Sequence, residues 1–157
     1  MTERSRLSRR QVLAASGSAC SVVAAGCTSS DGGGSDDDDW QQSLEPADWE
    51  DVDEIRLLGY TGGWEGVEPD LIAGIRNPSL LLFAGSEYEI TWENADGIPH
   101  NIAIRDDERD VVDDNRTSTM RDRGATQTLE FEATEAMHEY VCEPHPRQML
   151  GYIHVEE

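Results

Sequence analysis

Apolar and polar residues alternate with a period of two along most of the chain after residue 54. The clearest run is Tyr88, Ile90 and Trp92, which alternate with glutamates and a threonine. Successive side chains of a strand point to opposite faces, so such a run predicts a strand with one buried face. The remaining runs that predict strands lie at 55–57, 80–83, 100–104, 129–131, 138–142 and 153–155.

Gly, Pro, Asn and Asp separate these runs, and no amphipathic helix of useful length lies among them. Seven short strands within about a hundred residues predict an all-β fold, a Greek-key antiparallel β-sandwich of 7–8 strands. The polar stretch 106–124 is expected to form a loop or a short helix. The acidic segment 40–53 holds two tryptophans without a clear period, so the pattern does not place it.

The first 26 residues have the pattern of an export signal. Arg9 and Arg10 fit a twin-arginine motif, and the apolar stretch 12–26 follows them. At ~1.5 Å per residue this stretch is too short to cross a hydrocarbon core of ~30 Å as a helix. It predicts a signal peptide instead. Residues 24–27, Ala-Ala-Gly-Cys, resemble a lipobox and predict lipidation of Cys27. A plain signal peptide with a coincidental Cys27 is the alternative.

Three regions are therefore expected. Residues 1–26 are a twin-arginine signal peptide with a lipobox, 27–53 an acidic Gly/Ser/Asp tether, and 54–157 the folded domain. The signal predicts a location outside the cytoplasm, anchored through lipid to the outer face of the cytoplasmic membrane.

The charge balance excludes some classes of protein. The chain has 33 acidic residues against 12 basic ones, all arginine, and a formal net charge of -21. Such a charge argues against a nucleic-acid partner, whose phosphates need clusters of Lys and Arg. Disorder is the simplest interpretation of an acidic chain, but four Trp, four Tyr and the alternating runs argue against it. The composition instead indicates a folded protein of a halophile, because molar salt shortens the Debye length to ~3 Å.

The cysteines point to a metal or to catalysis. Cys20 leaves with the signal and Cys27 is expected to carry lipid, so the exported domain keeps one thiol, Cys142. A lone thiol in an oxidising compartment is a liability unless a metal or a reaction uses it.

Cys142 belongs to a short motif with further metal-binding side chains. His145 and Met149 follow it with the spacing C-x2-H-x3-M, and His100 lies 42 residues upstream. Two His and one Cys with a weak axial Met form the ligand set of a blue-copper site. The thiolate and the thioether stabilise Cu(I), and imidazoles suit both oxidation states, so this set favours electron transfer.

Each ligand has an alternative interpretation on its own. Cys142 and His145 could bind zinc, although zinc does not favour a thioether. Cys142 could be a nucleophile with His145 as its base, although no Asn or Asp that would orient the base is evident. His100 alone could be a satisfied strand histidine, and Met149 alone a core residue.

The segments Pro99-His100-Asn101 and 140–146, Tyr-Val-Cys-Glu-Pro-His-Pro, resemble the cupredoxin family, and within it the halocyanin and plastocyanin group. The resemblance covers about residues 54–157. It implies a Greek-key sandwich with one type 1 copper per chain. The ligands that it implies are His100, Cys142, His145 and Met149.

The resemblance also implies a supporting role for Asn101, which would tie the two ligand loops together and support the thiolate. Three residues separate His145 from Met149, whereas plastocyanins have four and amicyanins two. This difference leaves the axial bond length and the potential open. A dinuclear copper centre is excluded by the single Cys of the loop. His138 and His154 are expected to be structural or solvated.

The expected function is that of a monomeric single-electron carrier, not an enzyme. Its partners would be membrane-bound redox proteins: an oxidase, a cytochrome complex or a denitrification reductase. The electron port would be an apolar rim around the loop histidine, formed by Ile98, Pro99, Pro144, Pro146 and Leu150. A copper-binding or delivery module without electron transfer is the alternative, and a structural domain with a zinc or vestigial site is a third.

Overall fold

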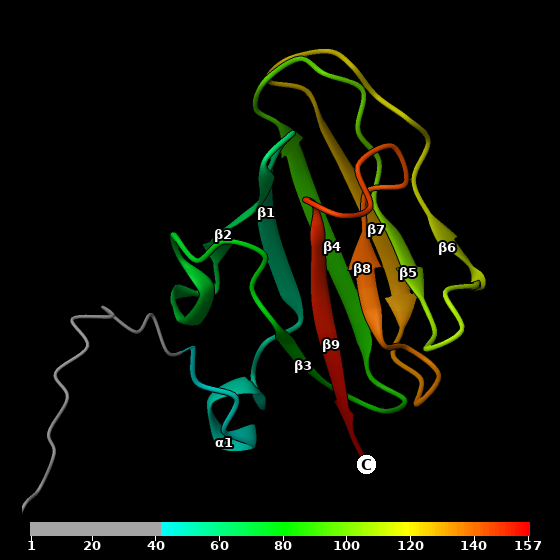
Figure 1. The fold of residues 1–157 in the computed structure, drawn as a ribbon. Helices are drawn as coiled ribbons and strands as arrows, with labels where there is room; N and C mark the ends of the chain where they lie inside the picture. The colour runs from blue at the N-terminus through cyan, green and yellow to red at the C-terminus, as the bar shows by residue number, and fades with distance from the viewer. Residues whose placement is uncertain (1–41) are drawn as a thin grey trace, which may run out of the picture. The chain divides into compact units, whose positions relative to one another are not determined.

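The computed structural model describes residues 42–157, which form one compact unit of two β-sheets (Figure 1). Two short helical turns, α1 and the 3-10 turn η1, accompany nine strands in the described part of the chain. The elements in chain order are α1 (Pro46–Trp49), β1 (Glu54–Tyr60), β2 (Gly63–Glu68), η1 (Asp70–Ile72), β3 (Leu80–Phe83), β4 (Glu87–Asn94), β5 (Ala103–Arg105), β6 (Val111–Arg116), β7 (Thr126–Glu132), β8 (Glu139–Val141) and β9 (Leu150–Glu156).

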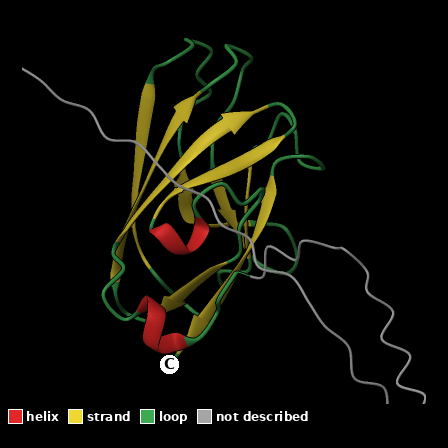
Figure 2. Ribbon diagram, turned by 90° about the vertical axis from the view of Figure 1, so that its left-hand side faces the viewer, coloured by secondary structure: helices red, strands yellow, loops and turns green. Residues whose placement is uncertain are grey.

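The two sheets have the strand orders β2-β1-β4-β7 and β3-β9-β8-β5-β6. They form the two layers of a sandwich, which Figure 2 shows from the side. The predicted all-β sandwich is confirmed. Two strand pairs, β1 with β4 and β3 with β9, are parallel, so both sheets are mixed rather than wholly antiparallel.

The alternating runs bury one face of each sheet in a shared core. Along β4 the even-numbered residues from Tyr88 to Asn94 are buried, and the residues between them are half-buried. Trp64 of one sheet lies between Trp92 and Tyr140, with ring centroids 5.7 Å and 6.4 Å away. Since Tyr140 belongs to the other sheet, these rings join the two layers.

Two strands escaped the prediction from sequence. In β2, Gly66 occupies a buried position where an alternating pattern would have an apolar side chain. A Cβ at Gly66 would lie 2.1 Å from the Ile72 carbonyl oxygen, so only glycine fits and the apolar–polar alternation is broken. In β6 only Val112 is buried, because this strand forms the edge of its sheet. The loop or short helix expected over 106–124 is therefore wrong for residues 111–116, which pair with β5.

The domain also begins earlier than residue 54. Trp49 of α1 is fully buried in the core, and its indole nitrogen donates to the Ser43 carbonyl oxygen at 3.0 Å. The backbone nitrogen of Ser79 donates to the side-chain oxygen of Gln42 at 2.8 Å. Residues 42–53 thus pack on the sandwich, and the tether predicted over 27–53 cannot extend through them.

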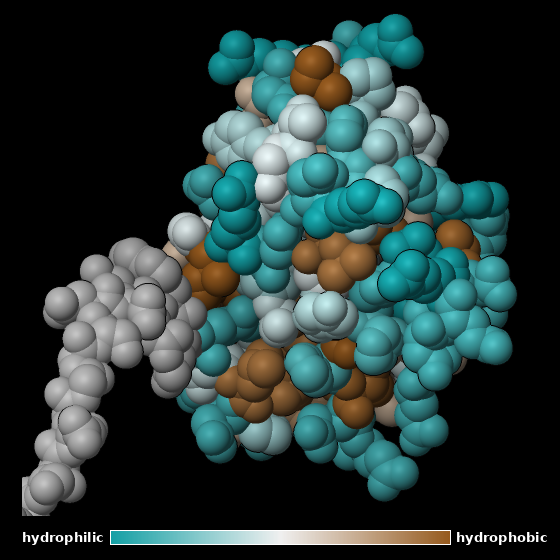
Figure 3. Space-filling model, viewed as in Figure 1, coloured by the Kyte–Doolittle hydropathy of each residue, from teal (hydrophilic) through white to brown (hydrophobic). Residues whose placement is uncertain are grey.

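The predicted signal peptide, the lipobox with Cys27 and the rest of the tether lie outside the described residues. Within residues 42–157, no helix is both long and apolar enough to cross a membrane. The face shown in Figure 3 is mainly hydrophilic, and apolar residues appear on it as separate small groups.

Candidate metal centre

One loop of the site connects β4 to β5 and carries His100. The backbone of His100 exchanges hydrogen bonds of 2.9 Å and 2.7 Å with Met120 of a neighbouring segment. The buried side chain of Asn94 shapes the start of the loop, since it accepts from the Gly97 nitrogen at 2.7 Å and donates to the Ile98 carbonyl at 2.8 Å. These bonds fix the backbone that precedes His100.

The second loop connects β8 to β9 and carries the other three predicted ligands. Its backbone closes on itself: the Cys142 nitrogen donates to the Met149 carbonyl at 2.9 Å, and the Met149 nitrogen donates to the His145 carbonyl at 3.0 Å. The side chain of Asn77 donates to the Gln148 carbonyl at 2.9 Å and so holds the loop from outside. The spacing C-x2-H-x3-M thus forms a compact turn.

Three donor atoms converge between the two loops. The sulfur of Cys142 lies 3.6 Å from Nδ1 of His100 and 3.6 Å from Nδ1 of His145. The two Nδ1 atoms are 3.2 Å apart. His100 and Cys142 are fully buried, whereas His145 is half-buried. In the described part of the chain this is the one group of at least three His, Cys, Asp or Glu side chains whose donor atoms lie within 4.8 Å of one another.

These donors fit a copper ion. One sulfur and two imidazole nitrogens that face a common point are the equatorial set of a blue-copper site. Met149, the predicted axial ligand, is fully buried and lies at the end of the same loop. The donor set therefore matches the metal that the sequence predicts.

The surroundings of Cys142 act on its pKa in both directions. Burial raises the pKa of the thiol, and backbone N–H groups of Asn101 and His145 that bond to the sulfur oppose this rise. These N–H groups favour the thiolate, which is the form that binds metal. Burial also lowers the pKa of His145, the neighbouring His100 imidazole lowers it further, and the Asp96 carboxylate opposes this shift. His145 is therefore neutral and able to bind metal near pH 7.

Asn101 lies between the two loops. Its amide nitrogen donates to the Glu143 carboxylate at 2.6 Å and to the Thr117 carbonyl at 3.3 Å. Its amide oxygen accepts from the Glu143 backbone nitrogen at 3.0 Å. Asn101, which follows the ligand His100, is thus bonded to Glu143, which follows the ligand Cys142.

Asp96 was not among the predicted site residues. Its carboxylate lies 2.9 Å from Nε2 of His100. Burial would raise the pKa of Asp96, but hydrogen bonds from Ile98, Thr61 and His100 outweigh it and hold this pKa well below its usual range. The four-residue spacing to His100 was the available signal, but it indicates a contact only once the turn is known.

The predicted rim residues differ in exposure. Ile98 is 43% exposed. Pro144 and Pro146 are exposed as well, whereas Pro99 and Leu150 are half-buried. Ile98, Pro144 and Pro146 are thus the rim residues that face solvent most.

The remaining predicted histidines lie apart from the donors. His138 is exposed, and its ring centroid lies 6.0 Å from that of Tyr152. His154 is exposed on β9. Neither belongs to the group of converging donors.

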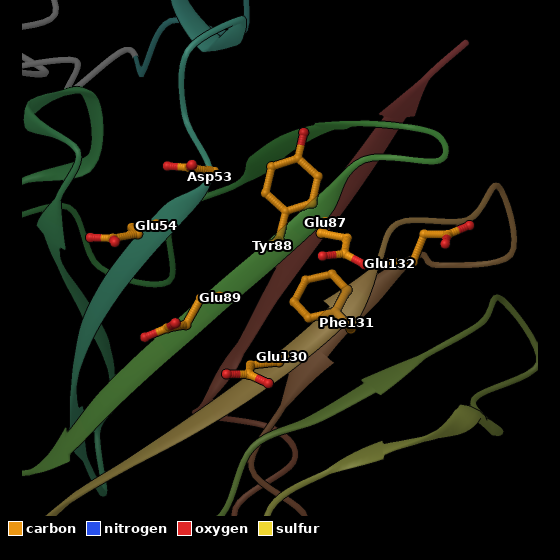
Figure 4. Close-up of a pocket in the computed structure, with 8 residues that line it drawn as sticks. All are labelled: Asp53, Glu54, Glu87, Tyr88, Glu89, Glu130, Phe131 and Glu132. Carbon is orange, nitrogen blue, oxygen red and sulfur yellow. The ribbon is translucent and has the colours of Figure 1, made fainter.

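An acidic pocket lies away from the metal donors, over the first half of β4, whereas His100 follows the end of that strand (Figure 4). Tyr88 and Phe131 line it, and their rings stack with centroids 6.0 Å apart. Its six carboxylates belong to Asp53, Glu54, Glu87, Glu89, Glu130 and Glu132. The pocket has no His or Cys, and we assign it to the acidic surface of the protein.

Comparison with known proteins matches part of the chain to a copper-binding family. Residues 81–156, which include all four predicted ligands, match the model of copper-binding proteins, plastocyanin/azurin family. The match supports the predicted resemblance to the cupredoxins, and together with the donor group it supports copper as the cofactor. It matches no curated protein sequence at a significant level.

Several solved structures are similar to this chain. Reduced auracyanin from Roseiflexus castenholzii is 17% identical, with 68% of this chain and 98% of that chain covered and a TM-score of 0.48. Rusticyanin from Thiobacillus ferrooxidans is 16% identical, with 66% and 76% covered and a TM-score of 0.49. A Cu(I) form of an amicyanin variant is 22% identical, with 66% and 83% covered and a TM-score of 0.43.

Proposed function

We propose that this protein carries single electrons and has no substrate of its own. The observation that carries the proposal is the convergence of one thiol sulfur and two imidazole nitrogens, 3.2–3.6 Å apart, from two loops. Copper bound there supplies the one-electron couple. The family match supports copper binding, and a thiolate with two imidazoles suits both oxidation states of the metal.

The protein's own contribution is a rigid and partly dry site. His100, Cys142 and Met149 are fully buried, so water is largely excluded from their side of the centre. The backbone bonds of the ligand loop and the amide of Asn101 hold the donors in place. Because the ligands need not rearrange, electron exchange should be fast.

Electrons would enter and leave at His145. It is the half-buried member of the donor group, and the exposed prolines 144 and 146 flank it. We expect the partner to dock on this apolar rim, because molar salt screens long-range attraction by the acidic surface. Pro146→Asp should slow electron transfer to a partner several-fold and leave the visible spectrum unchanged. Glu130→Gln, on the acidic pocket, is the matched control, and a slower rate for this control alone would contradict rim docking.

The N-terminal sequence supports a proposal about the location and the partners of the protein. We propose export by the twin-arginine route and anchoring through Cys27 at the outer face of the cytoplasmic membrane. The partner would then be a membrane-bound redox protein, namely an oxidase, a cytochrome complex or a denitrification reductase. Metabolic labelling with a fatty acid, compared between wild type and Cys27→Ala, tests the anchor. Equal labelling of both would contradict it.

Repeated redox cycling separates an electron carrier from a delivery module. The copper-loaded chain would be reduced with ascorbate and reoxidised over many cycles in the presence of a Cu(I) chelator. A carrier keeps its copper and returns to the same spectrum in each cycle. Transfer of the metal to the chelator at the first reduction would contradict the proposal and favour delivery.

A further inference from the structure

The outer nitrogen of the buried ligand His100 faces a carboxylate. Nε2 of His100 lies 2.9 Å from Oδ1 of Asp96, and the side chain of His100 is fully buried while that of Asp96 is 25% exposed. The other ring nitrogen, Nδ1, faces Cys142 and His145. The imidazole therefore lies between an anion and the metal donors.

Asp96 is itself held in place. Its Oδ2 accepts from the backbone nitrogen of Thr61 at 2.7 Å and from the Thr61 hydroxyl at 2.8 Å. Its Oδ1 accepts in addition from the Ile98 nitrogen at 3.0 Å. The carboxylate thus receives donors from the β1–β2 turn and from its own loop, so its position does not depend on His100 alone.

This arrangement determines which nitrogen carries the proton. An ionised carboxylate only accepts hydrogen bonds, so Nε2 of His100 must be the protonated nitrogen. The lone pair of the neutral ring then lies on Nδ1, toward Cys142 and His145. Carboxylate partners of this kind fix the orientation of metal-binding histidines and raise their basicity.

His145 differs from His100 in this respect. Within residues 42–157, the polar contacts of the His145 ring are made through Nδ1, with His100 and Cys142. The two imidazoles are therefore unequal, since one is buried against a fixed anion and the other is half-buried.

We propose that Asp96 is a positioning residue that fixes the metal-binding tautomer of His100 and makes the centre favour Cu(II) over Cu(I). A negative charge behind a ligand stabilises the more highly charged metal ion, and it makes the imidazole a stronger donor. The part of the inference that concerns the potential rests on the proposed electron-carrier function. The part that concerns the tautomer does not.

The first test is the reduction potential of the full chain loaded with copper. In Asp96→Asn the ratio of Cu(II) to Cu(I) affinity should fall about tenfold, which raises a one-electron potential by ~59 mV. Asp96→Glu, which restores the charge, should recover at least part of the change. Asp122→Asn removes an exposed carboxylate from the segment beside the His100 loop and is the matched control.

An unchanged potential in folded, copper-loaded Asp96→Asn would overturn the electrostatic role. An equal rise in Asp122→Asn would do so too, because the effect would then be one of general surface charge. Should Asp96→Asn fail to fold, the test on the unmodified protein described next still decides the positioning role.

The second test uses the unmodified protein. Nitrogen-15 NMR of the metal-free chain should show His100 with its proton on Nε2. A proton on Nδ1 would overturn the positioning role, whether or not the protein carries electrons. Conversely, an Nε2 proton in a protein that loses its copper on reduction would leave the inference standing and refute the carrier function.

Discussion

Replacing Asn101 by alanine should destabilise the metal-free domain by ~2–3 kcal/mol. The change removes three hydrogen bonds: two from the amide nitrogen, to Glu143 and Thr117, and one to the amide oxygen from the Glu143 nitrogen. A neutral hydrogen bond contributes ~1 kcal/mol net, and one to a charged group ~1.5–3 kcal/mol. The exposed Glu143 carboxylate can turn to water and recover most of the charged bond, which leaves a loss of ~2–3 kcal/mol.

The assay is urea unfolding of the metal-free chain at constant high salt. With a slope of ~1–3 kcal/mol per molar urea, the urea midpoint should fall by ~0.7–3 M and the slope should stay the same. The visible band of the copper form should persist, because the backbone N–H of Asn101 that bonds to the Cys142 sulfur remains. Copper should dissociate faster, because the two ligand loops are no longer joined by the amide.

Asn115→Ala is the matched control, since Asn115 is a half-buried asparagine on β6 outside the site. It should change the unfolding free energy by a few tenths of a kcal/mol at most, the usual scale for surface changes. Equal midpoints for Asn101→Ala and wild type, or equal losses in both variants, would refute the claim that the Asn101 amide holds the loops together.

Three further predictions test other parts of the structure. Trp49 is fully buried, so Trp49→Ala should lower the unfolding free energy by ~3–5 kcal/mol, as for other buried aromatics. A loss below ~1 kcal/mol in denaturant unfolding would contradict the packing of residues 42–53 on the sandwich. Burial raises the pKa of Tyr140 well above its ordinary 10.0, so the unfolded chain loses this proton first and stability should fall above about pH 10, by at most ~1.4 kcal/mol per pH unit. Tyr140→Phe should flatten that fall, and an unchanged pH dependence would contradict the assignment. Glu89 and Glu130 lie directly opposite each other on β4 and β7, so Glu130→Gln should raise the thermal midpoint in dilute buffer and lose this effect in molar salt, where screening is strong; a gain that is independent of salt would exclude repulsion as its cause.

The sequence predicts those strands in which burial of one face produces a local alternation of apolar and polar residues. Tyr88, Ile90 and Trp92 alternate because one face of β4 is buried, and that pattern is readable without the fold. β2 has no such pattern, because Gly66 must let the Ile72 backbone approach. The parallel pairing of β1 with β4 depends on chain crossings between the sheets, which local alternation does not encode.

The site residues likewise divide into those that the sequence predicts and one that it does not. Cys142, His145 and Met149 lie within eight residues, and a ligand set with that spacing is visible in the sequence. The sequence also predicts His100, 42 residues upstream, as the second imidazole, and the structure places its Nδ1 beside the sulfur. Asp96 could not be predicted, because its role depends on the turn that aims it at Nε2 of His100.

The copper centre is tested most directly by the visible spectrum of the full chain in molar salt after addition of Cu(II). We expect an intense blue thiolate-to-copper band that ascorbate removes and an oxidant restores, with one copper per chain. Cys142→Ser should abolish the band. A colourless protein that binds copper weakly, or that binds zinc in preference, would contradict the account.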